Sequence, residues 1–151
     1  MHAHRLDAYK LAPAGMNALR AVEAYLHDTS LGAPLIELVK MRASQINGCA
    51  YCLDMHSKAL RQGGETEQRI YLLNAWRESP LYTPRERAAL AWTEALTRIV
   101  ETQAPDDTYE ELRRHFDDKE IVDLTTLIGM INLWNRLAIS LRYEHPQGHD
   151  R

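Results

Sequence analysis

The chain has 151 residues, of which 45% are hydrophobic and 26% are charged, and its formal net charge is -3. This length allows one domain, residues 1–151, that buries a core without disulfide staples, and the composition is that of an ordinary globular protein. A negative net charge supplies no basic field for nucleic acid or anionic lipid, so we expect neither a nucleic-acid partner nor membrane binding.

The first ten residues contain no apolar stretch and no small-residue cleavage site, so we expect no secretory signal. The most apolar window, residues 124–141, includes Asn132, Asn135 and Arg136. It is too polar for a membrane span and predicts a buried helix. We therefore expect a cytoplasmic protein. In that reducing compartment, two cysteines spaced Cys-x-x-Cys are more often redox-active or metal-binding than structural.

Helical patterns follow one another along the chain, and no period-two run of β-branched residues predicts a strand. The first helix is expected over residues 14–27. The second is expected over residues 34–46, where Pro34 suits the first helical position. Asn47-Gly48 then interrupts the helical pattern.

The third predicted helix begins near Cys49 and ends at Gly63-Gly64, a strong stop signal. A short fourth helix is expected over residues 66–75. The pattern up to this point therefore places the Cys-x-x-Cys pair where one helix ends and the next begins.

The fifth predicted helix has the clearest start, because Thr83 and Glu86 form a capping box around Pro84. A sixth helix is expected over residues 107–115 and a long seventh over residues 118–143. The residues expected to face inward are Ala88, Trp92, Ala95, Leu96 and Ile99 on the fifth helix, and Ile121, Leu124, Ile128, Ile131, Trp134 and Ala138 on the seventh. The polar segment 145–151 is expected to be a flexible tail.

The chemistry-bearing residues are Cys49, Cys52 and His56. On a regular helix Cys52 falls about 60° and His56 about 20° to the same side of Cys49, so all three share one narrow face. His56 follows Cys52 by four residues, which makes the two neighbours on the helix surface. We expect all three side chains to be at least partly buried, because Leu53 and Leu60 lie near the same face.

This arrangement favours a reactive thiolate, which attacks peroxides and disulfides far faster than a thiol does. The helix N-terminus lowers the pKa of a nearby cysteine, which favours Cys49 as the nucleophile. His56 acts as a base toward Cys52, which favours Cys52 instead. Such activation also calls for a carboxylate that orients the histidine, and periodicity alone does not say which carboxylate that is.

Two less specific interpretations compete with redox chemistry. A zinc site would need histidines as further ligands, and on a regular helix Cys49 and His56 lie about 10 Å apart, too far to share a metal unless Cys49 bends off the helix. Two inert core cysteines are the other alternative, since free cysteine is often buried. Tyr51 is a proton donor or a packing aromatic, with no pattern to decide between the two roles. A thioredoxin-like fold is set aside because a helix, not a strand, leads into the pair.

At these residues the sequence resembles the alkylhydroperoxidase AhpD-like group of the carboxymuconolactone decarboxylase superfamily. The matching pattern is a glutamate followed, after eleven residues, by Cys-x-x-Cys-x-x-x-His; Glu37, Cys49, Cys52 and His56 fit it without a gap. The segments Met41-Arg42-Ala43-Ser44 and Asn47-Gly48 also look like the approach to the motif in that group. The close match covers residues 37–64.

The resemblance implies an all-α bundle of about six to seven helices that forms homo-oligomers, often trimers or hexamers. It implies a thiol peroxidase that reduces small hydroperoxides, with no cofactor or metal. In that scheme Cys52 attacks the peroxide, Cys49 resolves it to a disulfide, and His56 with Glu37 forms a proton relay. An external dithiol or a dihydrolipoyl-type partner reduces the disulfide again.

One departure from the group concerns Tyr51, which stands where the best-known branch has a histidine. A shorter relay and a modest hydroperoxidase activity follow from this change. We predict Cys52 as the nucleophile, because both its distance from His56 and the scheme of the group favour it. Two alternatives stay open: a redox sensor whose disulfide alters assembly without turnover, and a decarboxylase or lactone-processing enzyme of the same superfamily.

Overall fold

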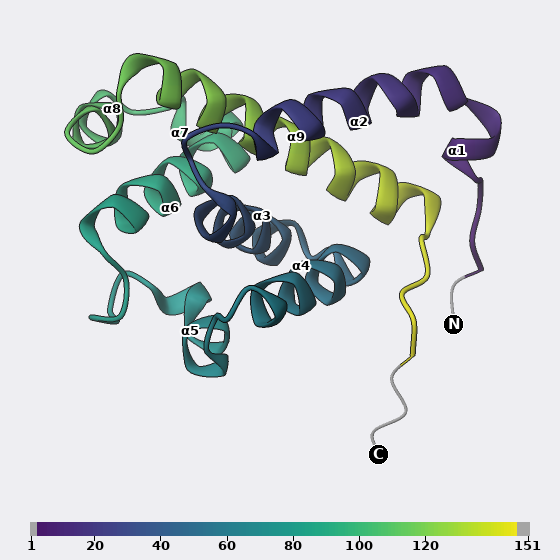
Figure 1. Ribbon diagram of the computed structural model, residues 1–151, viewed down its shortest axis with the longest axis horizontal. Helices are drawn as coiled ribbons and strands as arrows, with labels where there is room; N and C mark the ends of the chain where they lie inside the picture. The colour runs from purple at the N-terminus through teal and green to yellow at the C-terminus, as the bar shows by residue number, and fades with distance from the viewer. Residues whose placement is uncertain (1–2, 148–151) are drawn as a thin grey trace.

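A single helix, α3 (Ala33–Asn47), lies at the centre of the molecule, as the computed structural model shows for the residues it describes, 3–147. It packs against α4 (Ala50–Gln62), α6 (Pro84–Thr97) and α9 (Asp118–Leu141) (Figure 1). A helix enclosed in this way must be apolar around most of its circumference. The residues of α3 that are buried are Leu35, Ile36, Leu38, Val39, Lys40, Met41, Ala43 and Ser44.

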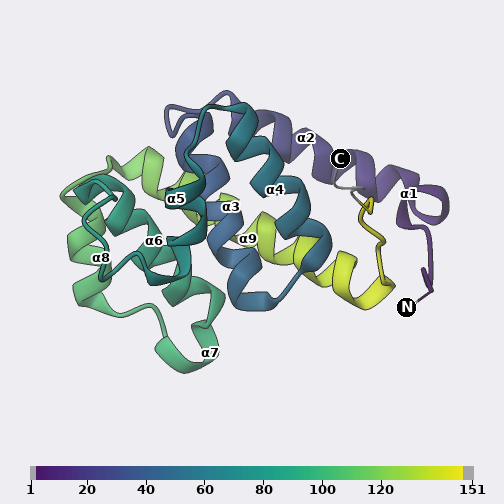
Figure 2. The ribbon, with the colours of Figure 1, turned by 90° about the horizontal axis from the view of Figure 1, so that it is seen from below.

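Shorter helices complete the fold around this centre. They are α1 (Ala8–Leu11), α2 (Pro13–His27), α5 (Glu67–Tyr71), a 3₁₀ turn (Leu73–Ala75), α7 (Ile99–Thr102) and α8 (Asp106–Arg113). In both ribbon views α2 runs alongside α9, and α5 and α8 lie at the end of the molecule away from α1 (Figures 1 and 2).

The all-α class predicted from the sequence is confirmed, and residues 3–147 contain no strand. The expected six to seven helices become nine α-helices and one 3₁₀ turn within that range. The predicted helix 66–75 is divided at Leu72, and α1 and α7 were not predicted, because four residues form a single turn without a repeating apolar pattern. Ile99, expected to be buried, begins α7 and is 48% exposed.

Capping residues set where the long helices begin. The predicted box at Thr83 and Glu86 is present, with both reciprocal hydrogen bonds formed. A second box, which the sequence reading missed, joins Asp117 and Glu120 at the start of α9. No helix within residues 3–147 combines the length and the apolar character that crossing a bilayer requires.

The N-terminal segment of the described chain contacts the C-terminal end of α9. The backbone N–H of Arg5 donates to the carbonyl of Leu141 at 2.9 Å, and its guanidinium donates to the carbonyl of Ser140 at 3.1 Å. Residues 145–147, part of the predicted tail, are exposed and not helical, and residues 148–151 lie outside the described residues. The N-terminal segment is thereby held against the end of α9, close to the cysteine pair.

Candidate redox site

A tight reversal between α3 and α4 places the two cysteines. Gly48 takes a left-handed conformation with φ 69°, which an L side chain would strain, and its N–H donates to the carbonyl of Ser44. Cys49 follows as the N-cap of α4, and its Sγ accepts a hydrogen bond from the backbone N–H of Cys52 at 3.3 Å. The Asn47-Gly48 break predicted from the sequence is therefore the turn that starts the site.

The structure joins Cys49 and Cys52 in a disulfide. Cys49 is 1%, Cys52 3% and His56 7% exposed, so the predicted burial is confirmed. The helix predicted to begin near Cys49 begins at Ala50, with Cys49 as its extended N-cap (φ -88°, ψ 97°), and the bond to Cys52 keeps both sulfurs on one side. Cys52 and His56 do lie one turn apart on α4, because both belong to the regular part of the helix.

Glu37 on α3 contacts His56 on α4, with 2.8 Å between Oε2 and Nδ1. Nδ1 is therefore the donor to the carboxylate, which leaves Nε2 as the other functional nitrogen. Burial alone raises the pKa of Glu37, but the hydrogen bond and positive charge of His56, with the charge of Lys40, hold that pKa below its ordinary value. Glu37 is accordingly a carboxylate that keeps the ring of His56 in place.

Cys52 and His56 line the same cavity, which has a volume of about 300 Å³. Its walls come from α1, α2, α3, α4 and α9 and from Tyr143, two residues after the end of α9. The other lining residues are Tyr9, Arg20, Glu23, Lys40, Tyr51, Met55, Trp134, Ala138 and Tyr143. A largely aromatic and aliphatic wall with a few polar groups suits a small organic molecule.

Glu23 pairs with two other polar residues of this cavity. Lys40, which is 5% exposed, donates to Glu23 at 2.7 Å, and the indole N–H of Trp134 donates to the second oxygen of Glu23 at 2.7 Å. This pairing joins α2, α3 and α9 at the cavity wall and neutralises the buried charge of Lys40. Arg20, which also belongs to the wall, is exposed.

Two tyrosines border the disulfide. The rings of Tyr51 and Tyr143 meet edge to face at 5.5 Å. The hydroxyl of Tyr143 is buried and has no hydrogen-bond partner among the described residues. Burial, together with Tyr9, Asp7 and Tyr51, raises the pKa of Tyr143, so its hydroxyl stays protonated. Tyr51 packs here, and its role as a proton donor stays a prediction.

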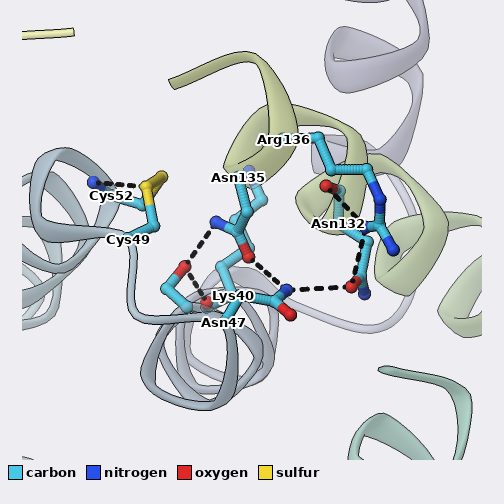
Figure 3. Close-up of a disulfide and its surroundings, with 8 residues drawn as sticks. Lys40, Asn47, Cys49, Cys52, Asn132, Asn135 and Arg136 are labelled. Atoms are coloured by element: carbon cyan, nitrogen blue, oxygen red, sulfur yellow. Dashed lines mark hydrogen bonds between the residues drawn. A yellow bond between two sulfur atoms is a disulfide. The ribbon is translucent and has the colours of Figure 1, made fainter. Parts of the chain in front are cut away.

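A buried polar network fixes the end of α3 against α9 (Figure 3). Asn47 donates to the side-chain oxygens of Asn132 and Asn135, each at 2.9 Å. Asn135 donates to the hydroxyl of Ser44 at 3.0 Å, and that hydroxyl donates to the carbonyl of Lys40 at 2.7 Å. Because every member is paired, the network holds the turn before Cys49 in one position.

Several cavity residues escaped the sequence reading: Tyr9, Arg20, Glu23, Lys40, Trp134 and Tyr143. Lys40 alone carried a signal, since it follows Glu37 by three residues and so shares its helix face. The others come from distant segments that only the tertiary fold brings together. Among residues 3–147, no group of three His, Cys, Asp or Glu side chains is placed to hold a metal ion.

The sequence profile of the carboxymuconolactone decarboxylase family matches residues 11–95, more than half of the chain. The chain belongs to the carboxymuconolactone decarboxylase family. The chain is also 44% identical to the uncharacterized protein YdfG of Bacillus subtilis, over 91% of its own length and 93% of the relative's.

Two solved structures place the chain more closely within the carboxymuconolactone decarboxylase family. One, a protein of unknown function from Agrobacterium tumefaciens proposed as an antioxidant defence protein AhpD, has a TM-score of 0.93 and 49% identity, covering 97% of this chain and 100% of that one. The other, an uncharacterized peroxidase-related protein from Silicibacter, has a TM-score of 0.80 and 30% identity, covering 91% of this chain and 73% of that one. The chain is thus an AhpD-like member of the family.

Proposed function

We propose that the protein is a thiol peroxidase that reduces small organic hydroperoxides through its cysteine pair. One observation carries the proposal: Cys52, in a disulfide with Cys49, opens onto a cavity shared with His56, and Glu37 orients that histidine. The AhpD and peroxidase-related descriptions of the structural neighbours support the same chemistry.

The first step uses Cys52 as the nucleophile. His56 takes the thiol proton, and the thiolate attacks the terminal peroxide oxygen. The O–O bond breaks, Cys52 becomes a sulfenic acid, and the alkoxide leaves as an alcohol with the proton that His56 returns. Glu37 keeps Nδ1 of His56 protonated, so that Nε2 is the nitrogen that accepts and returns the proton.

The second step uses Cys49 as the resolving residue. Its sulfur attacks the Cys52 sulfenic sulfur, the S–O bond breaks, and water leaves as the disulfide forms. An external dithiol then returns two electrons and two protons to the pair. The short distance between the two cysteines makes resolution intramolecular, which limits further oxidation of the sulfenic acid.

The test is to mix the reduced protein with cumene hydroperoxide in a stopped-flow instrument and count free thiols over time. We expect rapid loss of two thiols per chain, restored by dithiothreitol and absent in Cys52→Ser. In the matched Cys49→Ser variant we expect loss of one thiol and a sulfenic acid trapped by dimedone. Both thiols persisting in the wild-type protein would contradict the proposal and favour the sensor or lactone-processing alternatives.

A further inference from the structure

The two cysteines of the disulfide open onto different hollows. Cys52 lines the cavity described above, whereas Cys49 lines a second hollow of about 190 Å³ that lies against the end of α9. Neither cysteine lines the other's hollow. Tyr51, Ala138 and Tyr143 border both and therefore form the wall between them. The two cysteines of the disulfide are thus reached from two different hollows.

The second hollow carries fewer charged side chains than the first. Its lining residues are Gly48, Cys49, Ala50, Tyr51, Ala138, Ile139, Arg142 and Tyr143. Arg142 is the one charged residue in that set, and it forms no ion pair within residues 3–147. A lone positive charge beside a sulfur favours the approach of an anionic nucleophile such as a thiolate. The small volume admits a slender chain rather than a folded surface.

The direction of disulfide opening depends on which sulfur leaves as the thiolate. If Cys49 is attacked, Cys52 leaves beside His56, which supplies a proton to it. If Cys52 is attacked, Cys49 leaves beside the backbone N–H of Cys52 and near Arg142, and neither group transfers a proton to a thiolate at neutral pH. Only the Cys52 side therefore offers a transferable proton to the leaving sulfur, and the second hollow gives direct approach to Cys49.

We propose that the second hollow is the entry site of the reductant, a slender dithiol that opens the bond by attacking Cys49. One thiolate of the dithiol bonds to Cys49 Sγ, the Cys49–Cys52 bond breaks, and Cys52 leaves and takes a proton. The second thiol of the same reductant then attacks the mixed disulfide, so that Cys49 is released with the other proton and the dithiol becomes a cyclic disulfide. This inference rests on the redox cycle of the proposed function but not on a peroxide as the oxidant.

Two exposed residues allow the hollows to be blocked separately. Ala50 lines only the second hollow and Met55 only the first, and both are exposed at the surface of α4. Ala50→Trp and Met55→Trp are therefore matched variants that add bulk at one entrance each. The disulfide is first formed with diamide, so that the measurement does not depend on peroxide chemistry.

The measurement is the rate of thiol recovery when each oxidised variant is mixed with dihydrolipoamide. We expect Ala50→Trp to slow this reduction about tenfold and Met55→Trp to change it less than about twofold, the first being the effect of a barrier about 1.4 kcal/mol higher. Oxidation of the reduced proteins by cumene hydroperoxide should show the opposite order. Slower reduction in Met55→Trp, or equal rates in the two variants, would overturn the proposal.

A second measurement identifies the attacked sulfur directly. The oxidised wild-type protein is mixed with glutathione, quenched with an alkylating reagent and mapped by peptide mass spectrometry. A glutathione adduct on Cys49 supports the proposal, and an adduct on Cys52 overturns it. Failure of cumene hydroperoxide to consume thiols would contradict the proposed peroxidase function while leaving both reductant measurements valid.

Discussion

Two partly buried carboxylates in this fold, Glu37 and Glu94, both have a lowered pKa but lie in different surroundings. For both Glu37 and Glu94 burial raises the pKa, and hydrogen bonds with nearby positive charge more than offset that effect. Glu94 accepts from Arg42, Trp76 and Arg77, at 2.8–3.0 Å. Glu37 accepts from His56 alone among the described side chains, and that histidine lines a cavity with Cys52. A lowered pKa is thus common to both carboxylates, and we expect a role in redox chemistry only for Glu37, whose partner lies beside a cysteine.

The largest expected difference between the two carboxylates is the loss of stability in Glu94→Ala. Removing this acceptor leaves a partly buried indole N–H and Arg42 without their partner, so we expect the free energy of unfolding to fall by about 3 kcal/mol. The rate of thiol oxidation by cumene hydroperoxide in the folded variant should stay unchanged. Urea denaturation measures the stability and stopped-flow thiol counting measures the oxidation rate. Slower oxidation in Glu94→Ala would show that Glu94, like Glu37, affects the cysteine pair.

Glu37→Gln should slow thiol oxidation while leaving the stability almost unchanged. The amide keeps a hydrogen-bond acceptor for His56 but no longer stabilises its positive charge. We expect oxidation to slow about tenfold, a part of the roughly 10²–10⁴-fold that a positioned acid–base group supplies. Stability should change by less than about 1 kcal/mol. Glu37→Asp, which restores the charge at a shorter reach, is the control, and an unchanged rate in Glu37→Gln would show that the pair is structural.

The smallest effect is on the pH dependence of stability. Because the folded pKa of Glu37 lies below its ordinary value of 4.5, the unfolded chain binds the proton first as the pH falls. The contribution of the carboxylate is thus complete above about pH 4.5 and is lost as the pH falls through the folded pKa. Urea denaturation between about pH 3 and 6 should show a flatter curve for Glu37→Gln than for the wild-type protein. Parallel curves would mean that Glu37 titrates alike in both states.

The parts of this fold that local patterns encode were predictable from the sequence. The capping box at Thr83, the break at Gly48 and the burial of both cysteines follow from neighbouring residues alone. The contact between Glu37 and His56 joins two helices, so no period within one helix reveals it, and it came from the family resemblance.

Other features of the site depend on tertiary structure. The pairing of Glu23 with Lys40 and Trp134 brings together three helices, and a single sequence carries no sign of it. The position of Cys49 is a different case. The sequence predicted that a helix begins near Cys49, and Cys49 is the N-cap of α4, with its sulfur accepting from the Cys52 N–H. That the two cysteines line different hollows depends on α9 and could not be predicted from the sequence.

The disulfide closes only a small loop, so we expect its redox state to have little effect on folding stability. Only three positions separate Cys49 from Cys52, and closing so small a loop removes little freedom from the unfolded chain, about 2 kcal/mol in the chain-entropy view. The apolar core around α3, with Ile36, Val39 and Leu124 almost fully buried, contains neither cysteine. We therefore expect opening and closing of the bond to be local events inside a molecule that stays folded.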